Sequence, residues 1–146
     1  MQELFDLAAE LGFTVEYAAL RTRDGECRCD LKRIRLREGM PERLTRWTLA
    51  HELGHATLGH ELLIFGESDS RQEREADEWA ASYFITLERF REVEELREGH
   101  APSMARDFGI VTRGIVTYQR MLARLGDAVY LKPHHGAGQY AARIAI

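Results

Sequence analysis

Residues 41–60 read PERLTRWTLAHELGHATLGH and place two histidines and a glutamate in the pattern His51-Glu52-x-x-His55. Apolar residues recur at helical spacing along this stretch, and Pro41 suits the first turn of a helix that runs to about residue 60. Histidines four residues apart share one face of a helix, so both imidazoles can reach a single zinc ion, while Glu52 can address a water on that metal. The stretch therefore predicts the central, metal-binding helix of a hydrolase.

A third protein ligand is expected, because catalytic zinc takes three and leaves its fourth position to water. His60 follows His55 by five residues, which turns it about 140° away from the ligand face, so we expect it to cap the C-terminal end of the helix. The longer zinc pattern with a glycine and a third histidine fails, because Leu58 and Glu61 stand at those positions. The third ligand should then come from a later segment.

Glu73 and Glu75 are the candidates for that ligand, in a segment with the spacing of a helix. Glu73 and Asp77 share a helix face, whereas Glu75 points about 160° away from Glu73. With Glu73 as the ligand, Asp77 could accept the distal N–H of a ligand histidine. The alternatives are that Glu73 closes a capping box with Ser70 and that Asp77 lies on a solvated face.

The rest of the chain predicts a small sheet and more helices. The strands are expected at residues 13–17 and 34–37, with a hairpin turn at Asp24-Gly25, and they should form an antiparallel sheet. Helices are expected at residues 4–11, 76–84 and 87–96, and as a pair within 103–126. The fold class is therefore α+β, a small antiparallel sheet packed on a mainly helical core. We expect a single domain over residues 1–146, with a core of about 1–98 and a helical C-terminal part of about 99–146.

Composition limits the classes of partner. The 146 residues are 45% hydrophobic and 30% charged, which is typical of a globular protein. The net charge of −4 and the pI of about 5.9 argue against nucleic acid as the default partner. Cys27 and Cys29 should point the same way from one strand with little prospect of bridging, as reduced thiols. Without a cationic leader or a long apolar run, the protein is expected in the cytoplasm, away from membranes.

The chain resembles the ImmA/IrrE metallopeptidases, small gluzincin-type proteins of bacteria, their phages and mobile elements. The resemblance runs from about Leu4 to Phe84 and includes the leading helix and the hairpin. Its most specific parts are Arg33-Ile34-Arg35-Leu36, Trp47-Thr48-Leu49-Ala50, the motif His51 to His55, and Glu73-x-Glu75-Ala76-Asp77-x-Trp79-Ala80.

The resemblance implies a zincin-like core in which His51, His55 and Glu73 bind zinc and Glu52 is the general base. It also implies a protein substrate, a helix-turn-helix repressor of the Xre type, whose cleavage relieves repression of a mobile element or a stress regulon. Many relatives carry a Leu-Leu-Met-Pro-like break where this chain has residues 82–86, so the point at which that helix ends is left open.

Two parts of a peptidase site stay open at this stage. An oxyanion stabiliser is expected, and the histidines and tyrosines that could serve are Tyr83, His100, Tyr118, His134 and His135. The strand at residues 34–37 could pair with an extended substrate, and its arginines, Arg35 and Arg37, could attract acidic substrate residues.

Two other functions compete with repressor cleavage. Residues 103–126 loosely echo a helix-turn-helix and carry four arginines against one aspartate, which would suit a regulatory protein that binds DNA or another protein. A plain helical pair is the favoured interpretation of this segment. The second alternative is a zinc protease that acts on another host or defence protein, with the same site and a different substrate.

Overall fold

The computed structural model describes residues 1–61, 70–125, 128–130 and 143–145. They form two compact units, residues 1–76 and 77–146, and the boundary falls inside one helix, α3 (Ser70–Phe84). Helices dominate both units, and each also contains a small sheet, which confirms the predicted α+β class.

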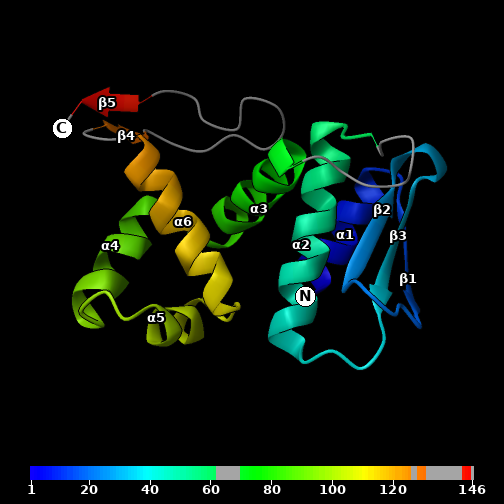
Figure 1. The fold of residues 1–146 in the computed structure, drawn as a ribbon, viewed down its shortest axis with the longest axis horizontal. Coiled ribbons are helices and arrows are strands. Elements are labelled where there is room, and N and C mark those ends of the chain that lie inside the picture. The colour runs from blue at the N-terminus through cyan, green and yellow to red at the C-terminus, as the bar shows by residue number, and fades with distance from the viewer. Residues whose placement is uncertain (62–69, 126–127, 131–142, 146) are drawn as a thin grey trace. The chain divides into compact units, whose positions relative to one another are not determined.

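The first unit is built of a three-stranded sheet, two whole helices and the N-terminal part of α3. Helix α1 (Gln2–Glu10) packs against strand β1 (Thr14–Ala18) and against helix α2 (Glu42–Leu58) (Figure 1). Helix α2 in turn packs against strands β2 (Gly25–Arg28) and β3 (Arg33–Arg37). The helix predicted from residues 41–60 is therefore the element that covers the sheet.

The sheet is mixed, with the strand order β1-β3-β2. The central strand β3 is parallel to β1 and antiparallel to β2, so the prediction of an antiparallel sheet was only half correct. The reason is that Gly25 opens β2 and does not turn a hairpin between β1 and β3. The hairpin instead joins β2 to β3 through the 3-10 turn Cys29–Leu31 and Lys32, which adopts a left-handed conformation with φ of 52°.

The central strand follows a two-residue alternation. Ile34 and Leu36 are completely buried against the helices, because alternate side chains of a strand point to one face. The arginines on the opposite face each pair with a neighbouring acid: Arg33 with Glu16 of β1, Arg35 with Glu26 of β2, and Arg37 with Asp24, which directly precedes β2. The face that the sequence predicted to be basic is thus neutralised within the sheet.

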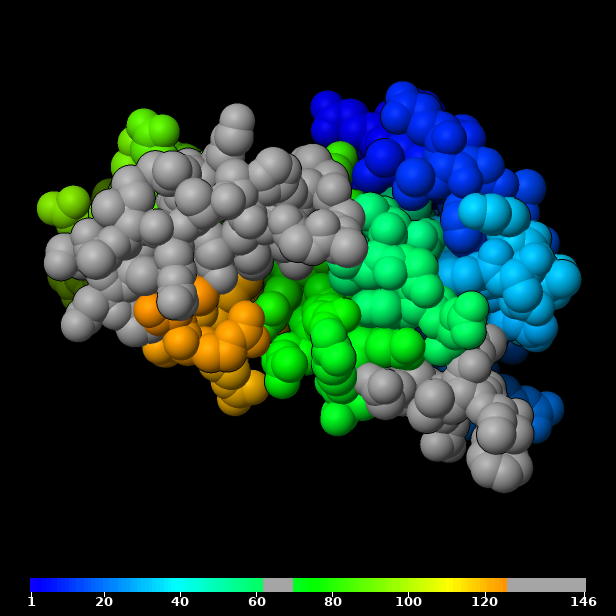
Figure 2. Space-filling view, turned by 90° about the horizontal axis from the view of Figure 1, so that it is seen from above, coloured from blue at the N-terminus to red at the C-terminus, as the bar shows by residue number. Residues whose placement is uncertain are grey.

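Helix α2 ends at Gly59, where the backbone turns sharply. Gly59 caps it in a left-handed conformation with φ of 67°, which glycine adopts without steric cost. This end of the helix lies beside the β2–β3 turn. The two segments line one pocket, with Gly59 and Glu61 on the helix side and Arg28, Cys29 and Asp30 on the strand side. Figure 2 shows the light-blue residues of the strand segment beside the teal residues of α2.

The second unit contains the C-terminal part of α3 and three further helices, α4 (Leu87–Leu96), α5 (Ala101–Phe108) and α6 (Thr112–Arg124). Thr86 ends the preceding segment by capping α4, because its hydroxyl oxygen accepts a hydrogen bond from the backbone N–H of Arg89 at 3.2 Å. The sequence had left this helix end open.

Short segments complete the second unit. After α4, Glu98 adopts a left-handed conformation with φ of 51°, directly before Gly99. Strands β4 (Ala128–Tyr130) and β5 (Arg143–Ala145) pair in antiparallel fashion, within the C-terminal part that was expected to be helical. Within the part of the chain that the structure describes, no helix has the length and apolar character needed to cross a membrane.

Candidate metal centre

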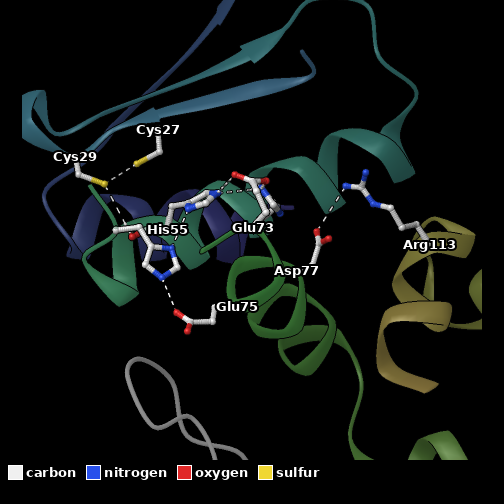
Figure 3. Close-up of polar contacts among 9 residues, drawn as sticks. Cys27, Cys29, His55, Glu73, Glu75, Asp77 and Arg113 are labelled. Atoms are coloured by element: carbon white, nitrogen blue, oxygen red, sulfur yellow. Dashed lines mark hydrogen bonds and ion pairs between the residues drawn. The ribbon is translucent and has the colours of Figure 1, made fainter. Parts of the chain in front are cut away.

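Three side chains converge at the face of α2 that carries the motif. The Nε2 atoms of His51 and His55 lie 3.1 Å apart, because the two residues are one helical turn apart. From the first turn of α3, the Glu73 carboxylate lies 3.2 Å from each imidazole, with Oε2 beside His51 and Oε1 beside His55 (Figure 3). The structure therefore brings together the residues that the resemblance implied as ligands.

The dimensions of this cluster fit a tetrahedral zinc ion. Zinc binds imidazole nitrogen and carboxylate oxygen at about 2.0–2.2 Å, which places neighbouring donors of a tetrahedron about 3.3–3.5 Å apart. The two imidazole nitrogens lie 3.1 Å apart, and each has its own Glu73 oxygen at 3.2 Å, which is close to that length. With one atom taken from each residue, the donors lie within 4.8 Å of one another. Two imidazoles and one carboxylate are also a donor set that catalytic zinc uses with its fourth position open. The residues present thus fit the metal.

Glu52 lies on the same helix and is buried, with 6% of its surface exposed. Burial raises the pKa of its carboxyl to about 7, since a carboxylate removed from water is less stable than the neutral acid. A positive charge on His51 opposes this shift, and the negative charge of Glu73 adds to it. A carboxyl in this position can take up and release a proton near neutral pH.

A close approach between β2 and α2 holds this carboxyl in place. A Cβ atom added at Gly25 would lie 2.6 Å from Cγ2 of Thr48 and 2.9 Å from Oε1 of Glu52. Position 25 therefore requires glycine for space and not for an unusual backbone conformation. In the sequence, Asp24-Gly25 predicted a turn, and nothing there indicated that this glycine contacts the site.

Comparison with known families places the site in context. Residues 8–118 match the Peptidase_M78 family, described as the IrrE N-terminal-like domain. The chain belongs to this family. The match covers the motif helix and Glu73, and it makes the protein a metallopeptidase in general terms, with a metal and a protein substrate. A comparison with curated proteins found no match.

His60 has a different place in this Peptidase_M78 protein from the one predicted. Its ring does not cap α2, because the left-handed Gly59 ends the helix and turns the next residue back along it. The Nδ1 atom of His60 lies 2.9 Å from Nδ1 of His55, and its Nε2 atom lies 2.9 Å from Oε2 of Glu75 (Figure 3). The glycine before His60 was the signal in the sequence that could have indicated this reversal.

Glu75 lies on a different side of α3 from Glu73, as the sequence predicted, and contacts His60 instead of the imidazole pair. Its other oxygen, Oε1, accepts a hydrogen bond from Nε of Arg71 at 2.7 Å. These two hydrogen bonds, from Arg71 and from His60, lower the pKa of Glu75. Glu75 therefore reaches the cluster only through His60, which contacts His55.

Asp77 follows Glu73 by one helical turn on α3 and belongs to the second unit. Its carboxylate lies 3.7 Å from the guanidinium group of Arg113 in α6 (Figure 3). The nitrogen of His55 that does not face Glu73 contacts His60, so it is not the partner predicted for Asp77. A contact of Asp77 with the other ligand histidine stays a prediction.

The candidates for an oxyanion stabiliser fall into two groups. Tyr83, His100 and Tyr118 all lie in the second unit of this Peptidase_M78 protein, and Tyr118 is buried there. His134 and His135 lie outside the described residues. The assignment of this role stays a prediction.

The two cysteines are free thiols, as predicted, but their geometry differs from the expected one. Cys27 lies in β2, whereas Cys29 begins the 3-10 turn, so the two are not on one regular strand. Their sulfur atoms lie 3.2 Å apart, and Sγ of Cys29 lies 3.9 Å from the backbone oxygen of His55. The expected placement on one strand was therefore wrong, because the turn brings the sulfurs together, while the two thiols are unbridged, as expected.

Proposed function

We propose that this Peptidase_M78 protein is a zinc-dependent endopeptidase that cleaves a helix-turn-helix repressor of the Xre type at a specific site. The observation that carries the proposal is the triangle of donor atoms from His51, His55 and Glu73, with the buried carboxyl of Glu52 on the same helix. The family supports peptidase activity in general. The sequence resemblance supports the repressor as the substrate.

In this mechanism His51, His55 and Glu73 would hold the zinc ion. Zinc bound there supplies Lewis acidity that polarises a peptide carbonyl and lowers the pKa of a water. Glu52 takes a proton from the attacking water at its carboxylate and delivers it to the nitrogen of the leaving amine. Its burial between α2 and Gly25 fixes the carboxyl in one position, which general base catalysis requires.

The strand that binds the substrate must differ from the one predicted. Residues 34–37 belong to β3, and both edges of β3 are occupied, by β1 and by β2. Among the described residues, β2 pairs only with β3, and its first residue, Gly25, lies against Glu52. We therefore assign the addition of an extended substrate segment to the outer edge of β2, where backbone hydrogen bonds would guide a peptide toward the catalytic carboxyl.

Metal content and cleavage, measured together, test the proposed function. Elemental analysis should find about one zinc per chain in the wild type and in Glu52→Gln, because that substitution leaves the three donors in place. Glu73→Gln should lose the metal, and Glu61→Gln serves as a control for the removal of one negative charge. Only the wild type and the control should cleave a purified Xre-type repressor. A wild type without metal, or full cleavage by Glu52→Gln, would overturn the proposal.

DNA binding by the α5–α6 pair is less well supported than peptidase activity. The pair does have a short connection through a left-handed Gly109, as a helix-turn-helix would. However, Arg113 and Arg124 of α6 pair with Asp77 and Glu78 of α3, which neutralises two of the four arginines of this segment. A zinc protease with another host or defence protein as its target would use the same site. A screen of purified substrates separates that alternative from repressor cleavage.

A further inference from the structure

A chain of hydrogen bonds leads outward from the imidazole of His55. Its Nδ1 atom lies 2.9 Å from Nδ1 of His60, whose Nε2 atom lies 2.9 Å from Oε2 of Glu75. The second oxygen of Glu75 accepts a hydrogen bond from Arg71 at 2.7 Å. Figure 3 shows Glu75 linked in this way to His55, while Glu73 lies against the other side of the imidazole. Both nitrogens of the His55 ring are therefore engaged.

The local fold builds this chain from two elements. Gly59 turns the backbone, so that the N–H of His60 donates to the carbonyl oxygen of His55 at 3.0 Å and the two rings lie edge to face with centroids 5.1 Å apart. The His60 side chain is 8% exposed, which limits its freedom to rotate. Helix α3 supplies both acids: Glu73 faces the imidazole pair, and Glu75, two residues later, faces His60.

The direction of each hydrogen bond follows from the chemistry of imidazole. A neutral imidazole carries its proton on one nitrogen and a lone pair on the other. When Nε2 of His55 donates its lone pair to a metal, Nδ1 must carry the proton and donate to His60. Nδ1 of His60 then accepts, so its proton sits on Nε2 and is donated to Glu75. Every donor meets an acceptor only in this arrangement, with Glu75 as a carboxylate at its end.

We propose that His60 and Glu75 are positioning residues, which hold the ring of His55 in the orientation and tautomer that bind zinc. The inference rests on the metal site of the proposed function and adds two residues to it. Outer partners of this kind orient a ligand histidine and raise its basicity, and their loss weakens metal binding about 10–100-fold. Neither residue contacts the reacting atoms.

Zinc affinity, measured by competition with a chromophoric chelator, tests the proposal. His60→Phe should weaken zinc binding about 10–100-fold, because the ring of Phe cannot accept the proton of His55. His60→Gln should lose less, since its amide oxygen can accept the same hydrogen bond. Glu75→Gln, at a partly exposed position, should also weaken binding, whereas Glu61→Gln should not. Circular dichroism checks that each variant is folded.

The zinc-loaded protein provides a second and independent readout. With zinc bound, nitrogen-15 NMR of the imidazoles should place the proton of His55 on Nδ1 and that of His60 on Nε2. The opposite tautomers would overturn the inference, as would wild-type affinity in His60→Phe or an equal loss in His60→Phe and His60→Gln. If Glu73→Gln abolishes binding while His60→Phe does not, only this inference fails. If the wild type binds no zinc, the proposed function fails as well.

Discussion

Replacing Gly25 by alanine tests the close packing of β2 against the motif helix. The added methyl group would lie 2.6 Å from Cγ2 of Thr48, whereas ordinary contact begins at 3.4 Å, so one of the two elements must move by about 0.8 Å. Thr48 is β-branched and buried, and Glu52 is buried as well, so neither side chain can swing out of the way. The strand or the helix must therefore shift, which displaces the Glu52 carboxyl relative to the site.

Two effects of Gly25→Ala are expected. Overpacking of this kind costs about 1–3 kcal/mol of unfolding free energy, which corresponds to a fall in Tm of about 3 °C per kcal/mol for a chain of this size. A shift of nearly 1 Å at the general base should also lower kcat/KM for the repressor by up to about 100-fold. Urea unfolding followed by the fluorescence of the buried Trp47 and Trp79 measures the first effect. A cleavage assay measures the second.

Gly12→Ala is the matched control. Gly12 has φ of +80° and free space around its Cβ position, so alanine there costs about 1–2 kcal/mol through the backbone alone. The two variants should therefore be destabilised to a similar extent, while only Gly25→Ala loses activity. If Gly25→Ala has wild-type stability, or if it cleaves as well as Gly12→Ala, the reasoning about this contact is wrong.

Three further predictions concern charge. For Glu52, the pKa of about 7 in the folded, metal-free protein exceeds the ordinary 4.5, so the folded state holds the proton more tightly and the wild type loses stability as the pH rises from 4.5 to 7. Metal-free Glu52→Gln should therefore be more stable by about 3 kcal/mol at about pH 8 and by less than about 1 kcal/mol near pH 5, as urea unfolding will show. Arg124→Ala leaves the buried Glu78 carboxylate without its two hydrogen bonds from Arg124 and should lower the free energy of unfolding by about 1–3 kcal/mol. Its control, Arg120→Ala on the exposed face of α6, should change that free energy by less than about 0.5 kcal/mol in the same assay. Replacing Arg35 and Arg37 together by glutamine should cost no more than about 2 kcal/mol and leave kcat/KM for the repressor unchanged, because both charges are neutralised within the sheet; a large loss of cleavage by the folded variant would show that this face attracts the substrate.

The sequence predicted well whatever depends on short-range periodicity. The motif helix, the i to i+4 spacing of His51 and His55, and the opposite directions of Glu73 and Glu75 all follow from the geometry of a single helix. The helices of the second unit were also expected close to their observed bounds. These features need no knowledge of how distant segments meet.

The features that the sequence did not predict arise from the return of the chain after a turn. The parallel pairing of β1 with β3 depends on the hairpin at Cys29–Leu31, and a run of alternating residues does not specify its neighbour. In the same way, the helical position of His60 was extrapolated past Gly59, where the helix no longer exists. Local patterns give the direction of a side chain only while the element continues.

The left-handed conformation of Glu98 has a consequence for the tolerance of the protein to change. A residue with a Cβ atom pays about 1–2 kcal/mol for this conformation, which glycine adopts freely. The protein is therefore less stable than it would be with a glycine at this position after α4. Exchanging Glu98 for glycine would create a reserve against costly substitutions elsewhere, so that new substrate preferences could evolve at the strand edge without loss of the folded state.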